Sequence, residues 1–146
     1  MSLDPVVVIV TVPADPDVAF EVFTERLGAQ MIEVDVAPTA DGGIALFHDW
    51  TLDCRTNGKG EVRAATMAQL KALDAGYGYT ADQGKTFPFR GKGVGAIPSL
   101  AEAVTALPDR PLIFNFKSKD ASEADQLARA LQAAGRDVAK VGDAFY

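Results

Sequence analysis

Two acidic residues alternate with branched apolar residues in residues 32–36, which read Ile-Glu-Val-Asp-Val. In a β-strand, side chains two positions apart project from the same face, so Glu33 and Asp35 share one face. Adjacent carboxylates repel each other, and an interior face accepts them only with a cation, a proton or a basic side chain beside them. Mg²⁺ and Ca²⁺ prefer carboxylate oxygens and would supply that charge. The alternative is an edge strand whose acids face water.

The chain has a single histidine, His48, which follows a turn at residues 39–43 and a short apolar run at residues 44–47. Imidazole accepts or donates a proton near neutral pH. A histidine that leaves a strand beside a carboxylate pair therefore predicts a general acid or base next to a metal. A lone histidine also serves structural roles, and that interpretation stays open.

Residues 32–60 resemble the signature of the glycerophosphodiester phosphodiesterase family, and the similarity extends over about residues 18–117. The family pattern is E-x-D-V-x-x-T-x-D-G, followed by H-D and then by R-T-x-G-x-G. The matching positions in this chain are Glu33, Asp35, Val36, Thr39, Asp41, Gly42, His48, Asp49, Arg55, Thr56, Gly58 and Gly60. So many fixed spacings make the resemblance specific.

The resemblance implies a metal-dependent enzyme that hydrolyses glycerophosphodiesters to glycerol 3-phosphate and an alcohol. It implies Glu33 and Asp35 as ligands of Mg²⁺ or Ca²⁺, His48 as a proton-transfer residue and Lys117 as a catalytic phosphate contact. The family has a third carboxylate two positions before that lysine, where this chain has Asn115. An amide oxygen still binds these cations but brings no negative charge, so we expect Asn115 to be a weaker metal ligand.

The first motif of the family, His-Arg-Gly, is absent, because residues 10–12 read Val-Thr-Val. The family reaction uses a pair of histidines, and only His48 is present. Loss of one partner of an acid and base pair costs about 10²–10⁴ in rate. Two hypotheses follow: an enzyme of this family, or a catalytically impaired member that binds a phosphodiester or a protein partner.

The elements that must position these residues alternate between strands and helices, which predicts an α/β fold with parallel strands and outer helices. We expect strands at residues 5–12, 32–36 and 111–117, and helices at residues 17–27, from 66, and at residues 98–107. A last helix should begin at Asp120 or Ser122, bury Ala124, Leu127, Ala128 and Leu131, and precede a short strand at residues 138–141.

The resemblance implies a TIM-type barrel, but these are only three or four strand-helix units, and a closed barrel takes about 250 residues. We therefore expect a partial barrel, with residues 1–146 forming one domain of this family that is incomplete at its C-terminus. A longer polypeptide, a rebuilt fold or a homodimer whose copies complete each other would each resolve the open edges.

Residues 76–95 are rich in glycine and aromatic residues and show no sustained period. Long loops of this kind are commonly lids or binding loops. The basic residues of this segment could attract a phosphate, and we predict Arg90 as a substrate contact. The alternative is a surface insertion whose aromatic residues form a small core of their own.

The composition limits the remaining classes of function. The 146 residues are 48% hydrophobic and carry a net charge of −6, which argues against an extended nucleic-acid surface but does not identify a substrate. The small-molecule partner, a glycerophosphodiester, is what the resemblance implies. One cysteine, Cys54, excludes an internal disulfide. The apolar run at residues 6–12 is too short to span a membrane and has no basic leader, so we expect a cytoplasmic protein.

Overall fold

The computed structural model describes residues 31–146, which form one compact unit. The strand predicted at residues 5–12 and the helix predicted at residues 17–27 lie outside the described residues. Among residues 31–146, no helix is both long enough and apolar enough to cross a membrane.

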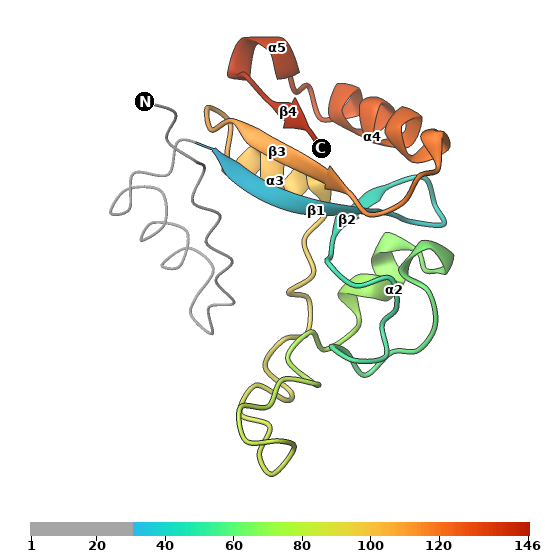
Figure 1. Ribbon diagram of the computed structural model, residues 1–146, viewed down its shortest axis with the longest axis vertical. Helices are drawn as coiled ribbons and strands as arrows, with labels where there is room; N and C mark the ends of the chain where they lie inside the picture. Colours follow the sequence, from blue (N-terminus) through green and yellow to red (C-terminus); the bar gives the residue numbers. More distant parts are fainter. Residues whose placement is uncertain (1–30) are drawn as a thin grey trace. The chain divides into compact units, whose positions relative to one another are not determined.

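The described residues build one mixed sheet, with its strands paired in the order β2, β1, β3 and β4 (Figure 1). The strands are β1 (Ile32–Pro38), β2 (Ile44–Leu46), β3 (Leu112–Phe116) and β4 (Ala144–Phe145). β1, β3 and β4 run parallel, whereas β2 returns antiparallel to β1 after the predicted turn. Gly42 has a φ of +84° in that turn, a conformation that favours glycine.

The helices begin where the sequence places capping residues. They are η2 (Val62–Ala64), α2 (Met67–Lys71), α3 (Leu100–Ala106), α4 (Ala121–Ala133) and α5 (Val138–Val141). Thr66 and Ser99 each form a capping box with the residue three positions later, which satisfies free N–H groups of the first turn. Asp120 caps α4, so the predicted starts of α2, α3 and α4 are confirmed.

The period-two pattern separates the two faces of the sheet as predicted. In the parallel pairing of β1 with β3, Asp35 lies opposite Asn115 and Val34 lies opposite Phe114. The apolar face is buried at Val36, Leu112 and Phe114. The other face carries the polar residues of both strands. Near Ala37, which pairs with Ala45 of β2, this face packs against a buried cluster of Ala45, Leu52, Val62, Leu70 and Ile97. This cluster fixes the segment after His48 against the sheet.

Two predictions for the last third of the chain are wrong. Residues 138–141 form helix α5 instead of a strand, because Asp137 caps its start and Gly142, with φ +84°, ends it. In α4, Ala124 and Ala128 are exposed, and the buried residues are Glu123, Leu127 and Leu131. The prediction is thus confirmed for Leu127 and Leu131 and wrong for the two alanines, and the buried stripe includes Glu123, whose carboxylate lies 3.7 Å from Arg63.

A buried ion pair fastens the start of β3. Arg136 and Asp143 are 2.7 Å apart, and their side chains are 3% and 0% exposed. Arg136 also donates to the carbonyl oxygens of Leu107, Pro108 and Arg110. Asp143 accepts from the backbone N–H of Leu112 at 2.8 Å, so the polar groups around the pair are satisfied.

Candidate active site

Asn115 of β3 joins the two acids of β1, and Lys117, which directly follows β3, contacts one of them. The amide nitrogen of Asn115 donates to Glu33 Oε1 at 2.7 Å and to Asp35 Oδ1 at 3.1 Å. Lys117 Nζ lies 2.6 Å from the same Asp35 oxygen. The side chain of Asp35 is 17% exposed and that of Lys117 is 29% exposed, so this ion pair is largely shielded from water.

β3 pairs with β1 beside both acids, whereas β2 pairs with β1 only at residues 36–38. The alternative in which the acids face water holds for Glu33, which is exposed, and not for Asp35, which contacts Lys117. Parallel pairing places residues 33 and 35 beside residues 113 and 115, and period two brings Lys117 to the same face. The compensation expected for two neighbouring carboxylates is therefore present as an ammonium group and an amide N–H₂ group. Glu33 remains exposed at its side of this cluster.

The hairpin of β1 and β2 delivers His48 to the region beside Asp35. The backbone N–H of Phe47 donates to the Asp35 carbonyl oxygen at 3.1 Å, so His48 is the residue directly after this contact. Its Nδ1 atom lies 2.7 Å from Asp49 Oδ1. Asp49 Oδ2 accepts from Arg55 Nε at 2.8 Å.

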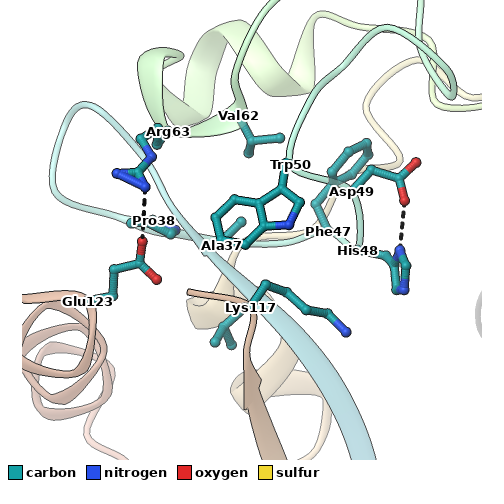
Figure 2. Close-up of a pocket in the computed structure, with 11 residues that line it drawn as sticks. Ala37, Pro38, Phe47, His48, Asp49, Trp50, Val62, Arg63, Lys117 and Glu123 are labelled. Atoms are coloured by element: carbon teal, nitrogen blue, oxygen red, sulfur yellow. Dashed lines mark hydrogen bonds and ion pairs between the residues drawn. The ribbon is translucent and has the colours of Figure 1, made fainter. Parts of the chain in front are cut away.

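His48 and Lys117 line one shallow pocket at the end of the sheet (Figure 2). Its apolar lining includes Val36, Ala37, Pro38, Phe47 and Val62. The indole of Trp50 lies at the centre of the view, with Arg63 and Glu123 on one side and Lys117 and His48 on the other. Trp50 is 52% exposed, so an aromatic surface is available beside the two groups that the sequence predicts to be catalytic.

Helix α4 contacts η2 and the hairpin turn beside this pocket through two polar side chains. Glu123 is 5% exposed and its carboxylate lies 3.7 Å from Arg63 of η2. Gln126 donates to the carbonyl oxygens of Thr39 and Gly43 in the hairpin turn, at 3.2 Å and 2.6 Å. The helix thus connects the hairpin before His48 with the segment after Trp50.

Arg90 lies in the loop of residues 76–95 and does not belong to the lining of the pocket that His48 and Lys117 share. Its guanidinium is 4.1 Å from the ring centre of Tyr77 and 3.8 Å from that of Phe87. It also donates to the Tyr77 carbonyl oxygen at 3.1 Å. These contacts give Arg90 a structural role within the loop, and its role as a substrate contact stays a prediction.

The base of this loop closes on Asp74, which is 4% exposed. Its carboxylate accepts from the backbone N–H groups of Gly76, Gly91 and Gly93. Burial alone would raise the pKa of Asp74, but these three hydrogen bonds outweigh it and lower the pKa below the ordinary value of 3.8. The loop therefore has a fixed attachment although it contains no helix or strand.

The residues that would hold a divalent cation such as Mg²⁺ or Ca²⁺ at the acid pair are Glu33, Asp35 and Asn115, where the ammonium group of Lys117 now contacts Asp35. One nitrogen atom of Asn115 contacts both carboxylates, and rotation of the amide by a half turn would place its oxygen on the same side. Two carboxylates and an amide then form an all-oxygen set, which these cations prefer. Within residues 31–146, no three His, Cys, Asp or Glu side chains are grouped closely enough to hold a metal, and the assignment of Glu33, Asp35 and Asn115 as metal ligands stays a prediction.

Sequence reasoning did not identify Trp50, Arg63 or Glu123 as parts of the pocket. Glu123 was hidden because an acidic residue next to alanines in an amphipathic helix is expected to face water. Asp49 and Arg55 were recognised only as members of a motif. Asp49 directly follows the histidine, and Arg55 comes six residues after Asp49. This spacing gave no indication that the two side chains contact each other.

Comparison with known proteins places this chain in a family. The model of the "Glycerophosphoryl diester phosphodiesterase family" matches residues 24–144. A glycerophosphodiester phosphodiesterase of Caldanaerobacter subterraneus is 36% identical over 108 residues, which cover 74% of this chain and 40% of that protein.

Two solved structures show the same fold. The glycerophosphoryl diester phosphodiesterase domain of an uncharacterized Mycobacterium tuberculosis protein has a TM-score of 0.69 and 25% identity, over 88% of this chain and 46% of that one. An Oleispira antarctica phosphodiesterase, solved with the product sn-glycerol-3-phosphate, has a TM-score of 0.57 and 26% identity, over 80% of this chain and 44% of that one. The predicted partial TIM-type α/β fold is confirmed.

Proposed function

Because this chain belongs to the glycerophosphoryl diester phosphodiesterase family, we propose that it acts in the hydrolysis of glycerophosphodiesters to glycerol 3-phosphate and an alcohol. The observation that supports this proposal is the position of Lys117. Its ammonium group contacts Asp35 of the acid pair, and its side chain lines the pocket with His48. The match to the Caldanaerobacter relative covers 40% of that protein.

In this proposal a divalent cation is held by Glu33, Asp35 and Asn115. When bound, it would neutralise negative charge on the phosphate oxygens. Enzymes of this family generally depend on a divalent metal, which supports the assignment of the donor set. Asn115 contributes an oxygen without a charge, so the affinity should be lower than that of a site with three carboxylates.

The side chains of the pocket have separate tasks in the reaction. His48 moves a proton to or from an oxygen of the substrate or of the attacking hydroxyl group. Lys117 offsets the charge that develops on the phosphate oxygens in the transition state. The exposed ring of Trp50 provides a surface for the organic part of the substrate. The partner is thus a small phosphodiester, and the net charge of −6 disfavours a nucleic acid.

The homodimer expected from the open barrel edges is a separate proposal. The paired sheet of residues 31–146 ends at β2 on one side and at β4 on the other. Unpaired strand edges favour association with another chain. Analytical ultracentrifugation of the purified protein tests it: a mass of twice 15.4 kDa supports the dimer and a monomer mass contradicts it.

The proposed reaction is tested by incubating the purified protein with glycerophosphocholine and Mg²⁺ or Ca²⁺ and measuring released glycerol 3-phosphate. The proposal expects metal-dependent release that falls by about 10²–10⁴ in His48→Ala. Circular dichroism of both proteins checks that the variant is folded. Binding of glycerophosphocholine without turnover would instead support the catalytically impaired family member.

A further inference from the structure

The ring of His48 is held by its own neighbour in the sequence. Nδ1 of His48 lies 2.7 Å from Asp49 Oδ1, and the other carboxylate oxygen of Asp49 accepts from Arg55 Nε at 2.8 Å. The Asp49 side chain is 24% exposed, whereas those of His48 and Arg55 are 57% and 50% exposed. The carboxylate is therefore the most shielded member of a chain of three contacts.

The protonation state of Asp49 decides which of its neighbours donates. Burial raises the pKa of Asp49, but the hydrogen bonds from His48 and Arg55 outweigh it and leave the pKa below the ordinary value of 3.8. At neutral pH the side chain is an ionised carboxylate, which can only accept hydrogen bonds. The short contact with His48 then requires a hydrogen on Nδ1.

We propose that Asp49, fixed by Arg55, is the positioning residue of His48, because it holds the neutral ring in the Nδ1–H tautomer and leaves Nε2 as a free proton acceptor. The tautomer of a histidine is set by the hydrogen bond that its other nitrogen makes. Arg55 occupies the second oxygen of Asp49, so the carboxylate cannot turn away from the ring without losing an ion pair.

The consequence for the reaction rests on the proposed function. A ring with Nε2 unprotonated begins as a base: an O–H bond of the attacking water breaks, an Nε2–H bond forms, and the water oxygen attacks phosphorus as the bond to the alcohol oxygen breaks. The leaving alkoxide takes a proton from solvent, and the ring releases its own proton to solvent, which restores the neutral ring. Asp49 stays ionised throughout and stabilises the positive charge on the ring.

The tautomer can be measured without substrate or metal, because the chain contains a single histidine. A long-range ¹H–¹⁵N spectrum of the ¹⁵N-labelled, tag-free protein resolves the two ring nitrogens. We record it at about pH 9, where an ordinary histidine is neutral. The proposal expects a protonated Nδ1 and an unprotonated Nε2. A protonated Nε2, or two averaged nitrogen signals, in the wild-type protein would overturn it.

Three variants separate this role from general folding of the loop. Asp49→Ala and Arg55→Met should each shift the ring toward the Nε2–H form or toward averaged signals. Asp53→Ala removes another acid of the same loop, one that contacts Lys59 and Gly60 instead of the histidine, and should leave the tautomer unchanged. If Asp49→Ala does not fold, the wild-type spectrum and Arg55→Met still decide the question.

The outcome is distinguishable from failure of the proposed function. A protein with the expected tautomer but no hydrolysis contradicts the proposed reaction and leaves the positioning role intact. A protein that hydrolyses glycerophosphocholine with a protonated Nε2 contradicts the positioning role alone.

Discussion

Asn115 lies directly opposite Asp35 in the parallel pairing of β1 with β3, and its amide nitrogen is 3.1 Å from the Asp35 carboxylate. The same nitrogen is 2.7 Å from Glu33. A carboxylate at position 115 would face two others at these distances, and like charges so close raise each other's pKa. The neutral amide instead connects the acids, which relieves repulsion but lowers the charge available to a cation.

The first prediction follows from this pair of residues. Asn115→Glu should bind Ca²⁺ or Mg²⁺ at least about tenfold more tightly than the wild-type protein, or about 1.4 kcal/mol, because it adds a third carboxylate. In EDTA its melting temperature should fall because three acids repel. Isothermal titration calorimetry and thermal unfolding measure both effects. Asn115→Gln is the matched neutral control, and equal affinity of the Glu and Gln variants would contradict the assigned donor set.

The second prediction concerns the ammonium group that contacts Asp35. Lys117→Met should reduce turnover of glycerophosphocholine by about 10²–10³-fold, because it removes a preorganised positive charge. The readout is the initial rate of glycerol 3-phosphate release. Lys119→Met, which changes an exposed lysine two residues later, is the control and should retain its activity. Equal losses in both variants would show that overall charge, and not position, matters.

The third prediction tests the buried ion pair that fastens β3. Asp143→Ala should lower the free energy of unfolding by about 3–5 kcal/mol, since it leaves the Arg136 guanidinium buried without its counter-ion. Denaturant unfolding measures the loss. Asp125→Ala, at an exposed position of α4, should change stability by no more than about 0.5 kcal/mol. A small effect at Asp143 would mean that the backbone carbonyls alone satisfy Arg136.

The fourth prediction is a pH dependence of stability. The hydrogen bond from Lys71 is the largest cause that lowers the pKa of Glu102 from 4.5 to about 2. The stabilising contribution of the ionised Glu102 should therefore be fully present above pH 4.5, the pKa of Glu102 in the unfolded chain, and be lost as the pH falls toward 2. Because the side chain is 54% exposed, the contribution should stay below about 1 kcal/mol.

The test compares the wild-type protein with Glu102→Gln by denaturant unfolding between pH 7 and pH 2. The stability difference between the two proteins should shrink through the acidic range and vanish near the lower end. Lys71→Met should reduce the same difference at neutral pH, because it removes the partner at 2.6 Å. A difference that does not change with pH would contradict this assignment.

The local elements were predictable because their signals lie within a few neighbouring residues. Alternation in residues 32–36 and in residues 113–117 placed the acids, Asn115 and Lys117 on defined faces, and Thr66 and Ser99 marked helix starts. The motif spacing also identified the family, since each matching residue has a local position that does not depend on packing. The strand predicted at residues 138–141 was wrong because a four-residue segment carries too little periodicity to distinguish a helix from a strand.

The contacts between these elements were decided only by the tertiary structure. The register of β1 against β3, and not either strand alone, placed Asn115 between Glu33 and Asp35. Likewise, the return of α4 to the hairpin buried Glu123 beside Arg63. Both are pairings over long sequence separations, and their energies depend on distance and burial, which residue types do not contain. The amino-acid sequence thus determined which chemical groups are present and on which face, and packing determined their partners.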